Sequence, residues 1–224
     1  MNGIHLGVHK GLNPEPSGET ARRILAVAVA IIDNSGESAL RIADVMRDAE
    51  VQAPMIYRHF GDREGLVQSA HLARALDALG AEIGAFEFAA ARVHDARSFE
   101  AAFTDLMATL CGPEFATMRR QRLEVFGSAL ARPVLRERIV ELRDLLVARS
   151  TEILLRAQRA GWIRCDLDVA AFVEWGIGST FGLASVEQFS AEPDIAEAWL
   201  RIQFEAVSSV LFGRTVTVHT GIAV

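Results

Sequence analysis

The stretch from Val51 to Phe60 carries the side chains of this sequence best suited to contact another molecule. Ile56 and Phe60 lie four residues apart and face inward if the stretch is helical. A helix with apolar spacing ends near Ala49, and a long helix begins near Asp62. Two short helices joined by a tight turn, with exposed side chains on the second, form a helix-turn-helix. The chemistry predicted is hydrogen bonding and apolar contact with base edges and phosphates of DNA.

The run from Pro54 to Leu66 resembles the DNA-binding signature of the tetracycline-repressor (TetR) family of transcriptional regulators. The matching residues are Ala49, Val51, Pro54, Tyr57, His59, Phe60 and Arg63. Glu50 replaces the glycine of the turn, Gln52 the usual serine and Met55 the usual threonine. Because that glycine normally has a positive φ, Glu50 is predicted to strain the turn by about 1 kcal/mol without breaking it.

The resemblance and the helix positions together predict which residues contact DNA. The predicted set is Arg41, Gln52, Ala53, Pro54, Met55, Tyr57, Arg58, His59 and Arg63. Arg63 and Tyr57 are assigned to phosphate, with Arg41 as a helper that cannot cap its helix. Ala53, Pro54 and Met55 offer apolar surface to thymine methyl groups, whereas Gln52 and Arg58 are candidates for polar base contacts.

The rest of the chain also has helical spacing, so the predicted fold class is all-α with about nine helices. Beyond a long helix from 62 to 91, helices are predicted at about 97–111, 114–130, 134–160, 167–188 and 194–212. We predict a flexible arm at 1–17, a three-helix helix-turn-helix domain at 18–80, a larger helical domain at 81–213 and a tail at 214–224. The resemblance implies that the larger domain binds a ligand and dimerises.

Composition excludes several classes of protein. The two cysteines, Cys111 and Cys165, form no zinc pattern, and no catalytic motif occurs, so we expect no metal, no cofactor and no enzyme. No apolar run approaches the roughly 18 residues of a membrane helix, and the amino terminus lacks the apolar core of a signal peptide, so a cytoplasmic protein is expected. The net charge is −6, and residues 18–80 hold seven Arg against nine Asp and Glu. This acidic balance favours the alternative of an effector-binding protein with degenerate DNA binding.

Two further sets of residues follow from the resemblance. Apolar stripes on the middle helices predict an effector cavity lined by Phe103, Met107, Met118, Arg122, Phe126 and Glu174. The last two helices predict a dimer interface of Trp175, Gly178, Gly182, Ser185, Trp199, Ile202 and Ala206, with packing inside one chain left open as the alternative. The implied function is a ligand-responsive regulator, a repressor, that binds a pseudo-palindromic operator in double-stranded DNA as a homodimer. A small, largely apolar effector would release or alter that binding.

Overall fold

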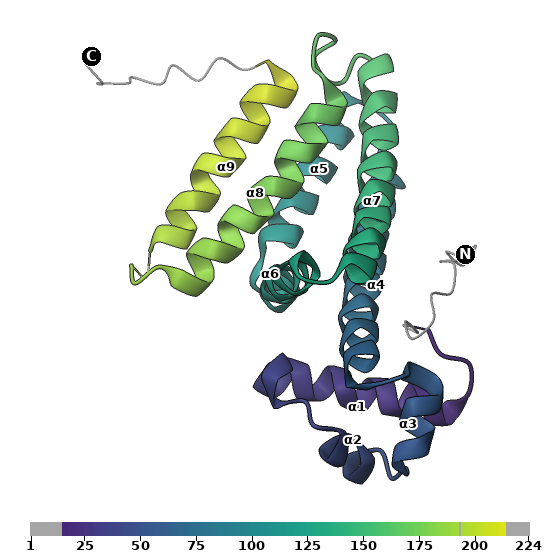
Figure 1. Ribbon diagram of the computed structural model, residues 1–224. Coiled ribbons are helices and arrows are strands. Elements are labelled where there is room, and N and C mark those ends of the chain that lie inside the picture. Colours follow the sequence, from purple (N-terminus) through teal and green to yellow (C-terminus); the bar gives the residue numbers. More distant parts are fainter. Residues whose placement is uncertain (1–14, 193, 214–224) are drawn as a thin grey trace. The chain divides into compact units, whose positions relative to one another are not determined.

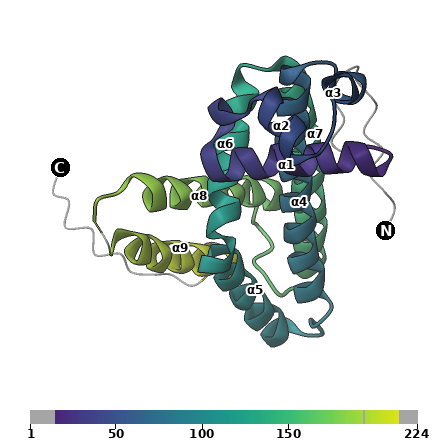
Figure 2. The same ribbon diagram turned by 90° about the horizontal axis from the view of Figure 1, so that it is seen from below.

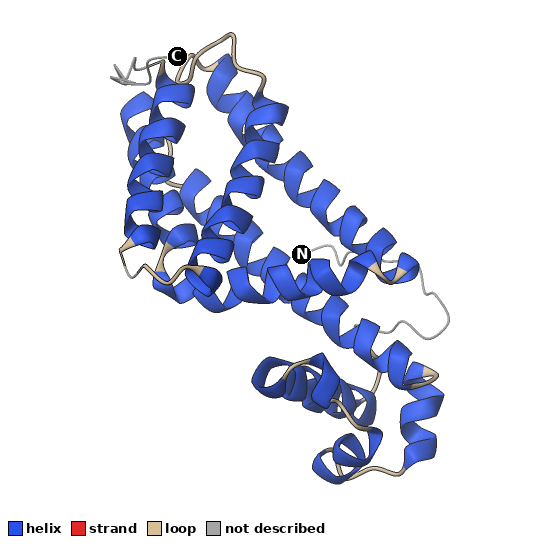
Figure 3. Ribbon diagram, turned by 60° about the vertical axis from the view of Figure 1, so that its left-hand side comes forward, coloured by secondary structure: helices blue, strands red, loops and turns tan. Residues whose placement is uncertain are grey.

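The computed structural model describes residues 15–192 and 194–213, where every regular element is a helix (Figure 3). The α-helices are α1 (Glu19–Ser35), α2 (Ile42–Asp48), α3 (Ala53–Phe60), α4 (Arg63–Ala90), α5 (Ala96–Cys111), α6 (Ala116–Leu130), α7 (Pro133–Arg159), α8 (Val169–Phe189) and α9 (Ile195–Phe212). Two short 3-10 helices are η1 (Glu37–Ala39) and η2 (Pro113–Phe115). The predicted all-α fold is confirmed, and the predicted tail and most of the predicted arm fall outside the described residues.

Contacts divide the chain into two compact units. Of the described residues, those within 1–80 and 121–144 form the first unit, and those within 81–120 and 145–224 form the second. The helices α4, α6 and α7 each begin in one unit and end in the other. Residues 121–144 return to the first unit after 81–120, and the predicted domain bounds stay a prediction.

The core of the first unit explains why α1, α2 and α3 lie together (Figure 1). On α1, Ile24, Ala28 and Ile32 recur every four residues and are almost completely buried. Ile56 and Phe60 of α3 are completely buried in the same cluster, as their spacing predicted. The predicted start of α4 is also confirmed, because the Asp62 carboxylate accepts the N–H of Gly65 at 2.7 Å.

The second unit has its own apolar core. Phe99 and Phe103 of α5 pack in one cluster with Leu154 of α7, Phe172 of α8 and Leu211 of α9. The first turn of α5 is held by a capping box, in which the Asp95 side chain and the Ser98 side chain each bond the other residue's backbone N–H. The Asp168 carboxylate caps α8, which runs beside α9 in both views (Figures 1 and 2).

One helix corrects the expectation that the sequence has no run apolar enough for a membrane. An 18-residue window of α8 has a mean hydropathy of 1.3, and only 28% of it is buried within this chain. The run arises because the helix is rich in glycine, alanine and large apolar residues, with Glu174 and Glu187 as its acidic residues. A helix of a soluble protein passes the same test of length and composition, and the exposed apolar face of α8 fits a partner helix.

Candidate DNA-binding surface and effector cavity

The turn between α2 and α3 has the hydrogen bonds of a Schellman motif. The N–H of Val51 bonds the carbonyl of Met46 at 3.0 Å, and the N–H of Glu50 bonds the carbonyl of Arg47 at 3.3 Å. Glu50 is the non-glycine residue with positive φ among those described, at 51°, which confirms the conformation predicted for this position. Val51 and Met46 both pack against the core, and this packing supports the strained turn.

The glutamate in this turn can be tested by substitution. Glu50→Gly should raise the free energy of unfolding by about 0.5 kcal/mol, because relief of the left-handed strain exceeds the extra entropy of an unfolded glycine. Glu50→Gln is the matched control, because it removes the charge and keeps the strained side chain. Both variants should bind DNA more tightly, since an exposed negative charge is lost. Equal stability of the two variants in urea denaturation would contradict the strain.

The predicted DNA-reading residues lie at or near the surface of α3. Tyr57 is 49% exposed, and Gln52, Pro54 and Arg58 are also exposed. Ala53, Met55 and His59 are half-buried, and Met55 packs partly against the core. Pro54 occupies the first turn of α3, where it interrupts no helical hydrogen bond. Exposure makes these side chains accessible, and their contacts with DNA stay predictions.

The structure gives the two predicted phosphate-binding arginines additional partners. Arg63 donates through Nε to the carbonyl of Leu40 and through Nη2 to that of Glu37, both at 2.9 Å. It therefore ties the start of α4 to the segment before α2, a structural role that the motif did not reveal. Arg41 stands at the N-cap of α2 without capping it, as predicted, and donates to the carbonyl of Ser38 at 2.8 Å.

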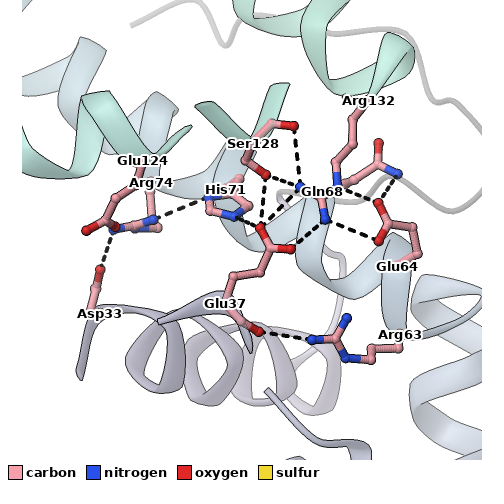
Figure 4. A network of polar contacts seen from close by, with 10 residues as sticks. All are labelled: Asp33, Glu37, Arg63, Glu64, Gln68, His71, Arg74, Glu124, Ser128 and Arg132. Carbon is pink, nitrogen blue, oxygen red and sulfur yellow. Dashed lines mark hydrogen bonds and ion pairs between the residues drawn. The ribbon is translucent and has the colours of Figure 1, made fainter. Parts of the chain in front are cut away.

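Glu37 is the centre of a polar network that joins η1, α4 and the end of α6 within the first unit (Figure 4). Its carboxylate accepts from Arg132 at 2.5 Å, from Ser128 at 3.1 Å and bonds His71 at 2.9 Å. Arg132 also donates to Glu64 at 2.5 Å. Burial alone would raise the pKa of Glu37. The hydrogen bonds from Arg132, His71 and Ser128 lower the pKa by more than burial raises it, to about 2.

His71 extends this network to Arg74. The His71 ring is 1% exposed, and burial lowers its pKa despite the hydrogen bond to Glu37, so the ring is neutral at pH 7. Arg74 can only donate, so Nδ1 of His71 accepts from it at 3.3 Å and Nε2 carries the proton toward Glu37. Arg74 also pairs with Asp33 at 2.9 Å and Glu124 at 2.5 Å. Sequence reasoning missed these residues, because they match no motif and come from distant parts of the chain.

A cavity of about 490 Å³ lies in the second unit among α4, α5 and α7. Of the six residues predicted to bind an effector, Phe103 lines it. Met107 packs against the neighbouring core, Met118 and Glu174 lie on α6 and α8, and Arg122 and Phe126 belong to the first unit. Effector contacts by these five stay predictions. The lining that sequence reasoning missed includes Phe86, Phe99, Leu106, Ile153 and Trp162.

The predicted dimer residues divide into those that face their own chain and those that remain exposed. A Cβ atom on Gly182 would lie 2.5 Å from Cζ2 of Trp199, so this glycine accommodates the indole of the same chain. A Cβ atom on Gly178 would meet nothing within 4 Å. Trp175 is 43% exposed and Ile202 is 68% exposed, Ser185 is exposed and Ala206 is half-buried. Intramolecular packing therefore accounts for Gly182 and Trp199, and the exposed residues leave an apolar face on α8 and α9.

Comparison with known proteins identifies the fold. Residues 24–70 match the tetR family of bacterial regulatory proteins, and no curated protein matches the chain. A TetR-family transcriptional regulator from Mesorhizobium loti is 16% identical, with a TM-score of 0.66 over 86% of this chain and 96% of that one. A TetR-family transcriptional regulator from Rhodococcus sp. is 24% identical, with a TM-score of 0.63 over 86% of this chain and 100% of that one. A transcriptional regulator from Saccharomonospora viridis in complex with choline is 17% identical, with a TM-score of 0.68 over 87% of this chain and 98% of that one. The chain therefore has the fold of TetR-family transcriptional regulators, and its residues 24–70, which include the helix-turn-helix, match the tetR family of bacterial regulatory proteins.

Proposed function

We propose that this protein is a ligand-responsive transcriptional repressor that binds a pseudo-palindromic operator as a homodimer in the cytoplasm. A small, largely apolar effector releases it. The observation that carries this proposal is the combination of an exposed α3 in the first unit with a cavity of about 490 Å³ in the second. A cavity of this size is within the range of about 300–1,000 Å³ found for small-molecule sites. The choline complex of the Saccharomonospora viridis regulator supports a ligand site on this fold.

The homodimer supplies the specificity that one reading helix lacks. Helix α3, from Ala53 to Phe60, is about two turns long and reaches few base pairs. Two copies related by a twofold axis would read two half-sites about one turn of DNA apart. The exposed Trp175, Gly178 and Ile202 on α8 and α9 support this interface, because large apolar groups beside small residues allow close helix packing.

Coupling between effector and operator follows from chain connectivity. The helices α4, α6 and α7 pass from one unit into the other, so a rearrangement around the cavity is transmitted along continuous helices. The network of Glu37, Arg132 and His71 joins α4 and α6 to the segment before α2. The effector can change DNA affinity only by its differential affinity for the free and DNA-bound conformations.

A matched pair of arginines, Arg41 at the N-cap of α2 and Arg47 in its last turn, tests the DNA-binding surface. Arg41→Ala should weaken binding to specific and random DNA alike and reduce the salt slope by about 1.8 per dimer, because two phosphate contacts are lost. Arg47→Ala should leave the slope nearly unchanged, because Arg47 is already paired with Asp44 and Asp48 at 2.8 and 2.7 Å. Electrophoretic shifts at several salt concentrations, with the DNA upstream of the protein's own gene, provide the measurement.

The same experiment addresses the second candidate function, a helical effector-binding protein with degenerate DNA binding. The exposed carboxylates of Asp48 and Glu50 beside α3 favour that alternative. Equal affinity for the upstream DNA and for random DNA would support it. An unchanged slope in Arg41→Ala would remove Arg41 from the phosphate contacts.

A further inference from the structure

The lining of the cavity in the second unit has a distinctive composition. Four of its fifteen lining residues are aromatic: Phe86, Phe99, Phe103 and Trp162. Five more are alanines, at positions 89, 90, 91, 102 and 157, and four are aliphatic. The two charged residues are Glu87 and Arg156. The lining is therefore aromatic and small on most sides and polar at one place.

The aromatic residues form a wall held in place by the core. The rings of Phe99 and Phe103 have centroids 6.0 Å apart and planes 27° apart. Trp162 is tilted against Phe99, with centroids 5.9 Å apart. Because Phe99 and Phe103 are only 5% and 8% exposed, packing restricts their rotation. Such a wall favours offset or edge contacts with another aromatic ring.

The alanines give the rest of the cavity a shape that also favours a flat ligand. An alanine side chain is a single methyl group without rotamers. This part of the lining is therefore smooth and does not adapt to a ligand by side-chain rotation. A rigid planar molecule loses little conformational entropy on binding there, whereas a long alkyl chain must order many torsions. The cavity is therefore better matched to a fused aromatic ring system than to an aliphatic chain of equal carbon number.

The charged residues indicate the polar part of the ligand. Glu87 can only accept hydrogen bonds when ionised, and Arg156 can only donate them, with Glu152 as its ion-pair partner at 3.6 Å. Their formal charges cancel, so the two together favour a neutral group that both donates and accepts. A smaller cavity of about 100 Å³ shares Glu87 and Arg156 and adds Arg149, Ser150 and Glu152. It continues the site on the polar side.

We propose that the cavity binds a planar, fused-ring aromatic molecule with a neutral hydroxyl or amide substituent directed at Glu87 and Arg156. This inference rests on the proposed function, because it names the chemical class of the effector. It differs from simple hydrophobic binding in a measurable way. Decanol buries more flexible apolar surface than naphthol at equal carbon number, so apolar area alone would favour decanol.

Calorimetric titration of the full chain with naphthol and with decanol, without DNA, compares the two classes. Naphthol should bind at least about tenfold more tightly. Ala102→Phe fills the cavity and should abolish naphthol binding, whereas Ala101→Phe, an exposed neighbour on the same helix, should not change it. If Ala102→Phe does not fold, Phe103→Leu carries the test. It should weaken naphthol about fivefold or more and change decanol about twofold or less.

Decanol binding equal to or tighter than naphthol would overturn the inference, as would no binding of either compound or an equal loss in Ala101→Phe. The proposed function is judged separately, by adding naphthol to the electrophoretic shift. Binding of naphthol at the cavity with no change in DNA affinity, at any operator, would argue against naphthol-class ligands as effectors and leave the cavity's ligand class intact.

Discussion

Replacing Arg132 with alanine should lower the free energy of unfolding by about 2–3 kcal/mol. The Arg132 side chain is 17% exposed and donates to two carboxylates, those of Glu37 and Glu64. Loss of a fully buried ion-pair partner costs about 3–5 kcal/mol, and the partial exposure of these carboxylates reduces that figure. Urea denaturation followed by circular dichroism measures the change. Arg136→Ala, at an exposed position on α7, is the matched control and should change stability by less than about 0.5 kcal/mol.

The pH dependence of stability should change in the same variant. The pKa of Glu37 is about 2 in the folded protein, below its ordinary value of 4.5. As pH falls, Glu37 therefore binds a proton in the unfolded chain before it does so in the folded protein. The contribution of the Glu37 carboxylate to the free energy of unfolding is present above pH 4.5 and is lost as pH falls toward 2. In Arg132→Ala this acid-dependent loss should become smaller. An unaltered pH profile between 5 and 3 would show that Arg132 does not stabilise the Glu37 carboxylate.

His71 contributes with the same sign but in a different pH window. Its pKa is lowered by burial, so stability falls as pH decreases below the ordinary value of 6.5. Glu37 bonds one ring nitrogen, and the charges of Arg74 and Arg132 oppose protonation. His71→Gln should remove the part of the acid-dependent loss that begins near pH 6.5. The Glu37 part, which begins near pH 4.5, should persist in that variant as long as Arg132 is in place.

Leucine substitutions at Gly178 and Gly182 should have opposite consequences. Gly182→Leu should destabilise the fold by about 2–3 kcal/mol, because its Cβ would lie 2.5 Å from the Trp199 indole. The indole has little freedom to move, since its Nε1 donates to Gln203 at 3.1 Å. Gly178→Leu should leave the isolated chain folded, because a Cβ there meets nothing within 4 Å.

In the proposed dimer, the same Gly178→Leu change would place a bulky side chain on the face that meets the partner. It should therefore shift the protein to monomers and weaken operator binding by about a hundredfold or more, since one reading helix alone remains. Light scattering and the electrophoretic shift measure the two effects. A Gly178→Leu protein that is still dimeric and binds the operator normally would exclude this face as the interface. Gly182 is unsuitable for that test, because its substitution damages the chain itself.

The helix-turn-helix was predictable because its determinants are local. The spacing of four residues between Ile56 and Phe60 indicates that both lie on the buried face of α3, and Pro54 marks the start of that helix. The strained φ of Glu50 followed from the position of the turn, because a Schellman ending needs a left-handed residue there whatever its type. The helices after α4 were predicted close to their observed bounds for the same reason, since apolar periodicity and caps act within one helix.

The partners of the buried polar groups and the lining of the cavity depend on tertiary structure. Glu37 and Arg132 are separated by 95 positions in the chain, and no local pattern relates them. Phe103 lines the cavity, and the other predicted effector-binding residues are absent from its lining. The walls of the cavity come from α4, α5, α7 and Trp162, and helical periodicity does not specify that these elements converge. The small-residue stripe of α8 likewise showed close packing without naming its partner. Gly182 faces Trp199 of its own chain while Gly178 stays open, because the direction of each residue depends on how α8 lies against α9.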